Sequence, residues 1–157
     1  MKKNSCFIAL IALAFTVLIG SFTTPIFAQA VLLSYNSLIT GRCLNSNDKG
    51  SVYEWGCPDG NNQTWSVTHT NSDAVTLSNQ ATGQCLDSNR KGNVYTLKCN
   101  DSDNQKWARL SSSATSVNFK NVATDRCLDN DTHGNVYALK CNGGDYQKWE
   151  AVKIQGK

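Results

Sequence analysis

Residues 85–107 read CLDSNRKGNVYTLKCNDSDNQKW, and residues 127–149 repeat this pattern as CLDNDTHGNVYALKCNGGDYQKW. A more divergent copy, CLNSNDKGSVYEWGCPDGNNQTW, occupies residues 43–65. The first cysteine, the second cysteine and the closing tryptophan each recur at a spacing of 42 residues, with no insertion. A constant period of this length indicates a repeat architecture. We therefore divide the chain into three units, 32–73, 74–115 and 116–157.

The apolar pattern within a unit is that of short β-strands. In the second unit Val75 and Leu77 alternate with polar residues, and turn-forming residues separate one run from the next. No window shows an apolar stripe at helical spacing. We expect four strands in this unit, at 74–78, 84–87, 93–99 and 105–110, and the same arrangement in the other two.

Three such units are too long for solenoid coils and too few for a common propeller. The predicted fold class is all-β, a β-trefoil of three 42-residue repeats of four strands with pseudo-three-fold symmetry. In this fold six strands close a barrel and three hairpins cap it, so that few sheet edges stay open.

The N-terminus has the three parts of a secretory signal peptide. A positive start at residues 2–3 precedes an apolar run at 7–20, and Ala28 and Ala30 then form a small–x–small pattern. The apolar run is short for a membrane span, which is the alternative interpretation. We expect cleavage after Ala30, or alternatively after Ala28. The predicted organisation is a signal peptide at 1–30 and one secreted domain, extracellular or periplasmic, at 31–157.

Charge argues against several classes of partner. Removal of residues 1–30 takes the formal net charge from +3 to +1, and no basic stripe suited to nucleic acid is present. No second apolar run is long enough to insert into a membrane. We expect a monomer without cofactor or metal.

Six cysteines remain after Cys6 leaves with the signal peptide. An even number behind a signal peptide indicates disulfides. Because each unit holds two cysteines fourteen positions apart, the symmetric solution is one bridge per unit, each contributing about 3 kcal/mol to stability. A zinc site is disfavoured, because there is no C-x-x-C and only His69 and His133 could assist. The predicted pairs are Cys43–Cys57, Cys85–Cys99 and Cys127–Cys141.

Each unit ends in Gln-x-Trp, at 63–65, 105–107 and 147–149. Three copies at equal spacing, each behind a C-L-[DN]…C pair, resemble the ricin B-type β-trefoil lectins over the whole mature chain. The second and third units also resemble the repeats of the actinohivin-like lectins, which bind high-mannose glycans. This chain departs from them in carrying both cysteines in every unit. The resemblance implies a non-catalytic protein that binds sugars.

Sugar recognition needs groups that match vicinal hydroxyls and groups that cover an apolar C–H face. The third unit has the fullest set, and its positions match those that contact sugar in the actinohivin-like repeats. A carboxylate accepts hydroxyl protons, a tyrosine and an asparagine donate, apolar side chains cover the ring, and a glutamine supports the site. These residues are Asp129, Tyr137, Asn142, Leu139, Tyr146 and Gln147.

The other two units depart from this set. The second has Asn104 in place of the covering tyrosine, so we expect a weaker or altered site at Asp87, Tyr95, Leu97, Asn100 and Gln105. The first differs most: it has an uncharged acceptor, a proline in place of the asparagine and a tryptophan in place of the leucine. We expect it to be inactive or tuned to another sugar. Its candidates are Asn45, Tyr53, Trp55 and Gln63.

Each candidate also has a purely structural interpretation. The aspartates could stabilise turns, the strand tyrosines and Trp55 could be packing residues, and the glutamines could hold backbone. We expect Trp65, Trp107 and Trp149 to be core rather than ligand contacts.

The function we predict is a lectin with up to three shallow sites and a preference for mannose-type glycans. The alternatives are a galactose- or xylan-type carbohydrate-binding module, a targeting subunit for a separate enzyme or toxin, and a protein-binding trefoil such as a protease inhibitor. A catalytic role is disfavoured, because the carboxylates follow the three-fold repeat instead of forming an asymmetric acid and base pair.

Overall fold

The computed structural model describes residues 31–58, 60–70, 73–111 and 115–154. The predicted signal peptide and its cleavage site therefore lie outside the described residues, except that Val31 begins the first strand. No helix among the described residues has the length and apolar character needed to cross a bilayer. The strands are β1 (Val31–Ser37), β2 (Cys43–Ser46), β3 (Val52–Trp55), β4 (Trp65–His69), β5 (Ala74–Asn79), β6 (Cys85–Ser88), β7 (Val94–Leu97), β8 (Trp107–Ser111), β9 (Ser116–Asn121), β10 (Arg126–Asn130), β11 (Val136–Lys140) and β12 (Trp149–Lys153).

A short 3₁₀ helix precedes the last strand of each repeat; these are η1 (Asn61–Gln63), η2 (Asp103–Gln105) and η3 (Asp145–Gln147). Four strands per repeat are confirmed, but the prediction that Gln105 begins a strand is wrong. The amide of Gln105 bonds the carbonyl of Ser102 at 3.0 Å, which closes a tight turn, and β8 begins only at Trp107. The Gln-x-Trp motif therefore begins at the last residue of a 3₁₀ helix and ends at the first residue of a strand.

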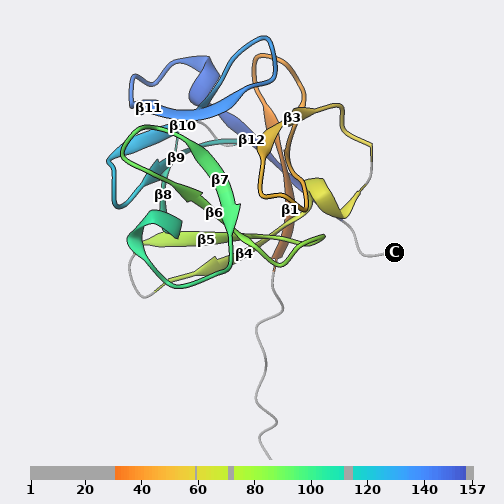
Figure 1. The fold of residues 1–157 in the computed structure, drawn as a ribbon. Coiled ribbons are helices and arrows are strands. Elements are labelled where there is room, and N and C mark those ends of the chain that lie inside the picture. Colours follow the sequence, from red (N-terminus) through yellow and green to blue (C-terminus); the bar gives the residue numbers. More distant parts are fainter. Residues whose placement is uncertain (1–30, 59, 71–72, 112–114, 155–157) are drawn as a thin grey trace, which may run out of the picture.

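Six antiparallel strands close a barrel. Pairings run β1–β4, β4–β5, β5–β8, β8–β9, β9–β12 and β12–β1, which returns to the starting strand. The remaining six strands form three hairpins, β2–β3, β6–β7 and β10–β11. Figure 1 shows these hairpins arranged around one end of the barrel. The predicted β-trefoil is confirmed.

The barrel core is built on the three repeated tryptophans, which are fully buried. Each indole Nε1 donates to the carbonyl of the leucine that follows the first cysteine of its repeat. The indoles are therefore satisfied inside the core, as buried Trp N–H groups generally are. This confirms that Trp65, Trp107 and Trp149 are core residues.

Backbone hydrogen bonds link the three hairpins around the pseudo-three-fold axis. In each, an amide of one hairpin donates to a glycine carbonyl in the turn of the next: Glu54 to Gly134 at 2.8 Å, Thr96 to Gly50 at 2.9 Å and Ala138 to Gly92 at 2.8 Å. Gly50 and Gly92 have positive φ, and a Cβ on either would lie 2.6 or 2.5 Å from the facing carbonyl oxygen. Glycine is required here for close approach as well as for the turn.

Each repeat contains one disulfide between its own two cysteines, at a sequence separation of 14. The bridge joins the start of the hairpin to the segment that leads into the 3₁₀ helix. It therefore closes the loop on which the candidate sugar-binding residues lie. The predicted pairs Cys43–Cys57, Cys85–Cys99 and Cys127–Cys141 are all confirmed.

Candidate functional site

The hairpin register brings two of the candidate positions directly opposite each other. Asp129 on β10 pairs with Tyr137 on β11, and Asp87 pairs with Tyr95 in the second repeat. Asn45 and Tyr53 pair in the same way in the first. Side chains directly opposite on one face of an antiparallel pair are neighbours. The acceptor and the tyrosine are therefore adjacent in every repeat.

An exposed apolar residue lies two positions beyond each tyrosine on the same face of the strand. Leu97 and Leu139 are 49% and 45% exposed, and Trp55 is 61% exposed. These three exposed apolar side chains lie at equivalent positions and are available to contact a ligand. The tryptophans of the Gln-x-Trp motifs are fully buried and are not available.

In the third repeat the 3₁₀ helix η3 places Gln147 behind the site, where its amide is fully engaged. The Nε2 group donates to Asp129 Oδ2 at 2.7 Å and to the carbonyl of Lys140 at 3.0 Å. Its Oε1 accepts the backbone amide of Asn142 at 3.0 Å. Gln147 thus orients the carboxylate and holds the loop, and it has no donor left for a ligand.

Three other groups of the third repeat remain open to the surface. The Asn142 Oδ1 atom accepts the amide of Gly144 at 2.8 Å, so its Nδ2 is the part free to donate. Tyr137 donates its hydroxyl to the carbonyl of Asn130 at 3.1 Å and keeps a lone pair as acceptor. Tyr146 is 42% exposed. The register therefore places Asp129, Tyr137 and Leu139 on one face of the hairpin. Gln147 lies behind them and joins Asp129 to the loop of Asn142, and Tyr146 is exposed on η3.

Burial sets the electrostatics of this site. The Asp129 carboxyl is buried, which raises its pKa, and hydrogen bonds from Gln147 and from the backbone of Asn130 act in the opposite direction. Burial, followed by the Asp129 and Asp131 carboxylates, raises the pKa of Tyr137. A desolvated carboxylate with one oxygen engaged by an amide is a strong acceptor for a hydroxyl group.

The second repeat keeps this arrangement with fewer contacts. Gln105 accepts the amide of Asn100 at 2.9 Å and donates to the carbonyl of Lys98 at 3.2 Å. Asp87 is buried, and burial together with the Asp87 carboxylate raises the pKa of Tyr95. Asn104 does not extend toward a ligand, because its side chain donates to the carbonyl of Ser88 at 2.6 Å.

Tyr146 is exposed because Asn130, and not the residue at position 146, provides the side-chain hydrogen bond between the 3₁₀ helix and the hairpin. In the first two repeats Asn62 and Asn104 donate to the carbonyls of Ser46 and Ser88. In the third repeat the direction is reversed, and Asn130, at the serine position, donates to the carbonyl of Tyr146 at 2.8 Å. The aromatic side chain is then free to point outward. Sequence reasoning missed this role, although the serine-to-asparagine difference was visible.

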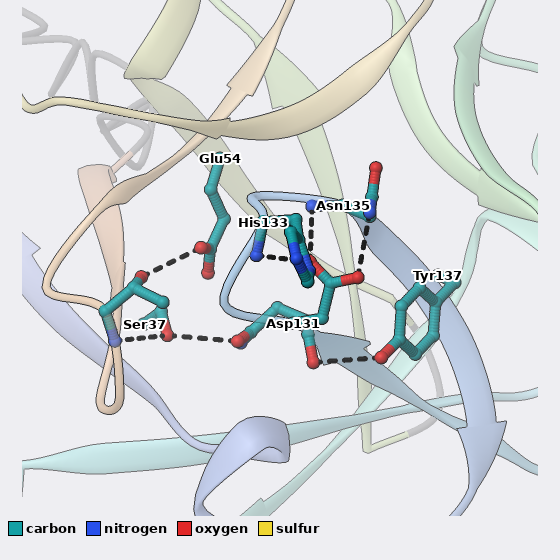
Figure 2. A network of polar contacts seen from close by, with 8 residues as sticks. Ser37, Glu54, Asp131, His133, Asn135 and Tyr137 are labelled. Atoms are coloured by element: carbon teal, nitrogen blue, oxygen red, sulfur yellow. Dashed lines mark hydrogen bonds and ion pairs between the residues drawn. The ribbon is translucent and has the colours of Figure 1, made fainter.

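A residue of the neighbouring repeat also changes its hydrogen-bond partner at the third site. Asn79 and Asn121 donate to the carbonyls of Asn62 and Asn104. The equivalent residue next to the third repeat is Ser37, whose hydroxyl donates instead to Asn130 Oδ1 at 3.3 Å. Figure 2 shows Ser37 and Tyr137 bonded to the same segment, with the Asp131–Asn135 turn beside them.

The first repeat surrounds a hollow with a volume of about 320 Å³. We call it the first-repeat hollow; Asn45, Tyr53, Trp55, Pro58 and Gln63 are among the residues that line it. The Tyr53 and Trp55 rings meet edge to face, with centroids 6.4 Å apart. The four residues predicted for this repeat therefore do come together, at a site that the sequence had presented as the most degraded.

Among the described residues, no group of three or more His, Cys, Asp and Glu side chains is arranged to hold a metal ion. The third repeat can pair hydroxyl groups with Asp129 and Asn142 and can cover an apolar ring face with Leu139 and Tyr146. This is the chemistry of sugar recognition.

Comparison with known proteins supports this conclusion at the level of the family. The family model described as "Ricin-type beta-trefoil lectin domain" matches residues 29–107 and 73–157. No curated protein matches the sequence.

Solved structures share the fold at low sequence identity. The designed three-fold symmetric protein ThreeFoil superposes with a TM-score of 0.73 at 21% identity, covering 78% of this chain and 99% of the other. SeviL bound to asialo-GM1 saccharide superposes with a TM-score of 0.69 at 15% identity, covering 80% and 99%. An exo-β-1,3-galactanase from Clostridium thermocellum superposes with a TM-score of 0.71 at 15% identity, covering 80% of this chain and 30% of the other. With the family model matching nearly all of the described residues, the chain belongs to the ricin-type β-trefoil lectin family and is a carbohydrate-binding protein.

Proposed function

We propose that the chain is a secreted, non-catalytic, monomeric lectin that binds glycans at shallow sites, one on each repeat. One observation carries the proposal. A buried hydroxyl acceptor, a tyrosine opposite it and an exposed apolar side chain recur on the same face of all three hairpins. A structural role alone would require neither the open apolar residue nor its position beside the acceptor.

At the third repeat, Asp129 Oδ1, which Gln147 does not bind, accepts from one sugar hydroxyl, and Asn142 Nδ2 donates to a neighbouring one. Leu139 and Tyr146 cover the C–H face of the ring. Gln147 does not touch the sugar; it holds the carboxylate in place through its 2.7 Å hydrogen bond. A pre-oriented acceptor loses little side-chain entropy on binding.

We propose mannose-type glycans as the ligands of the second and third repeats. The support is Leu97 and Leu139, aliphatic residues where a stacking aromatic would favour galactose, together with the resemblance to the actinohivin-like repeats. Each site is weak alone. Sites on one rigid trefoil can raise the avidity for a branched glycan by about 10²–10⁴ when the geometry matches.

The test is a glycan array with residues 31–157, compared with Asp129→Ala and with the double variant Asp87→Ala/Asp129→Ala. We expect stepwise loss of signal on mannose-rich glycans, while Thr68→Ala on barrel strand β4 binds as the wild type does. Inhibition by mannose, α-mannobiose and galactose orders the preference, and a chelator should change nothing. Wild-type protein that binds no glycan would refute the proposal, and Asp129→Ala that keeps its full signal would refute the role of this residue.

A second candidate is a targeting unit for a separate enzyme or toxin. It is favoured by structures in which the matching trefoil is only part of a larger chain, with 30% coverage of the galactanase and 18% of a mosquitocidal holotoxin. A co-secreted partner that elutes with the chain in size-exclusion chromatography of culture medium would support it, whereas elution as a free monomer would not. A protein-binding trefoil such as a protease inhibitor would keep its activity in Asp129→Ala.

A further inference from the structure

The loop that follows the second cysteine of the third repeat contains the one Asn-Gly pair of the chain, Asn142-Gly143. Both residues are exposed. In such a pair the backbone nitrogen of the glycine can attack the side-chain amide carbon of the asparagine, because glycine has no Cβ to obstruct the approach. The same loop carries the Asn142 Nδ2 group that we assign to sugar binding, so a reaction here would alter the third site.

The backbone nitrogen of Gly143 is available within the described part of the chain. Gly143 lies outside the strands and the 3₁₀ helices, and its N–H forms no hydrogen bond with another described residue. Its φ is 70°, a conformation that glycine adopts without strain. No hydrogen bond between described residues therefore has to break before this nitrogen can turn toward the side chain of Asn142.

The carbonyl under attack already has a hydrogen-bond donor on its oxygen. Asn142 Oδ1 accepts the backbone amide of Gly144 at 2.8 Å. Attack on the amide carbon moves negative charge onto this oxygen, and a donor already in place stabilises such charge. The backbone amide of Asn142 donates to Gln147 Oε1 at 3.0 Å, and the neighbouring Cys141 is held by its disulfide. Asn142 is therefore fixed, while the two glycines after it keep the most conformational freedom.

The second repeat has a matching loop with a side chain at the position of the first glycine. Asn100 is exposed, and its Oδ1 accepts the backbone amide of Ser102 at 3.0 Å, which is the same turn. Asp101 has a φ of 59° where the third repeat has Gly143. Its side chain obstructs the approach of the Asp101 nitrogen to the asparagine, whereas glycine leaves that approach open. The two loops therefore share the turn and differ at the residue whose nitrogen attacks.

We propose that Asn142 is a site of spontaneous modification, at which deamidation removes the side-chain amide of the third repeat. Gly143 N forms a bond to Asn142 Cγ, the bond from Cγ to Nδ2 breaks, and Nδ2 leaves as ammonia with the proton of the Gly143 amide. Water then opens the resulting five-membered imide at either carbonyl and yields aspartate or isoaspartate. The reaction consumes a water molecule and releases an ammonia molecule, and it needs no other reactant.

The product changes what the third repeat offers to a ligand. The amide of Asn142 donates from Nδ2, whereas a carboxylate only accepts. The new charge adds to that of Asp129 in the same repeat, and isoaspartate also lengthens the backbone of the loop by a methylene group. We expect the third site to weaken as the protein ages, while the second repeat keeps its affinity. This consequence rests on the proposed glycan-binding function, whereas the reaction itself does not.

Incubation of the purified protein in mildly alkaline buffer tests the reaction. Peptide mapping by mass spectrometry, with unincubated protein as the reference, should locate the replacement of an NH₂ group by OH at Asn142. Fragmentation of the same peptide should identify isoaspartate as part of the product. Asn100, in the matching loop, should stay unconverted over the interval in which half of Asn142 is converted.

Two reciprocal variants exchange the residue that differs between the loops. Gly143→Asp introduces the residue that already has this backbone conformation in the second repeat, so the protein should fold and Asn142 should stay intact. Asp101→Gly should make Asn100 convert in the same way.

The effect on binding is measured on separated forms of the protein. Anion exchange separates the modified protein, which carries an additional negative charge, from the unmodified form. An Asp87→Ala background leaves the third repeat as the proposed mannose site. In this background, calorimetric titration with methyl α-mannoside should show loss of binding in the modified fraction, and Asn142→Asp should reproduce that loss.

The proposal is overturned if Asn142 stays intact in the incubated protein, or if Asn100 converts as readily beside Asp101 as Asn142 does beside Gly143. Modified protein that binds methyl α-mannoside as tightly as the unmodified form would overturn the assigned effect on the third site. Conversion of Asn142 in a protein that binds no glycan when fresh would support the modification and refute the proposed function.

Discussion

The replacement Asp129→Asn separates the charge of the third site from its shape. Asparagine has nearly the same volume and keeps an oxygen that can accept from Gln147 Nε2, now 2.7 Å from Asp129 Oδ2. The first repeat already carries asparagine at this position, with Asn45 buried to the same degree. The hairpin should therefore fold unchanged, and any effect on binding follows from the loss of the carboxylate.

The size of the effect follows from the hydrogen bonds that a sugar makes with this carboxylate. Hydrogen bonds to a charged group contribute about 1.5–3 kcal/mol, compared with about 1 kcal/mol for a neutral pair. Loss of the charge should therefore weaken monovalent binding at this site by about ten-fold, since 1.4 kcal/mol corresponds to a factor of ten. Calorimetric titration of both proteins with methyl α-mannoside measures this ratio.

Although Asp129→Asn should weaken sugar binding, it should not lower the stability of the folded protein at pH 7. Burial raises the pKa of Asp129 in the folded protein, so the folded state holds the proton more tightly than the unfolded chain does. The ionised carboxylate then lowers stability as the pH rises through the interval between the two pKa values, and the penalty persists at neutral pH. Asp129→Asn should melt at the same temperature as the wild type or higher at pH 7.

Wild-type binding at the third repeat should also be lost on acidification, beginning above the pH at which an ordinary aspartate is protonated, whereas the residual binding of Asp129→Asn should be flat. Equal affinity in the two proteins would refute the role given to the charge. A melting temperature of the variant several degrees below that of the wild type would refute the account of burial.

Further substitutions test the packing between repeats, each by thermal unfolding at pH 7. Ser88→Ala should raise stability slightly, because the Ser88 hydroxyl is buried and has no hydrogen-bond partner among the described residues. Ser46→Ala should lower stability by about 1 kcal/mol, because the Ser46 hydroxyl lies 2.8 Å from Thr96 Oγ1. Asn130→Ser should cost about 1 kcal/mol and weaken sugar binding at the third repeat, since the Tyr146 carbonyl loses its donor. Replacing Cys127 and Cys141 by serine should cost about 3 kcal/mol, from the closed loop.

Symmetry made the framework predictable. A period of 42 residues shared by the cysteines and the tryptophans left one economical disulfide pairing and one type of fold, and both are confirmed. The burial of Trp107 and its equivalents followed from the same repeat. These features depend on what the three copies have in common, which one sequence can reveal without any relatives.

Differences between the copies were harder to interpret, because their consequences pass through the backbone. Asn104 was expected to be a missing apolar cover, whereas in the structure it ties η2 to the carbonyl of Ser88. Pro58 was expected to be a lost asparagine side chain, but proline also lacks the backbone N–H that Asn100 and Asn142 donate to the glutamine of their own repeats. Sequence patterns describe side chains well, but they do not show which carbonyl or amide each side chain serves.

The position of the candidate sites explains how the copies could diverge without loss of the fold. In each hairpin, alternate residues face opposite sides, so that Leu128 is buried in the core while Leu139, on the paired strand, stays open. The disulfide and the glycine-mediated contacts at the axis fix the backbone independently of the outward residues. Exchange of Leu139 for a tryptophan, as in the first repeat, therefore alters the surface offered to a ligand and leaves the core contacts in place. The three sites can therefore come to differ through substitutions of outward-facing residues alone. Where such a substitution removes a hydrogen bond, as Tyr146 does at the asparagine position, a second substitution such as Asn130 supplies a new one.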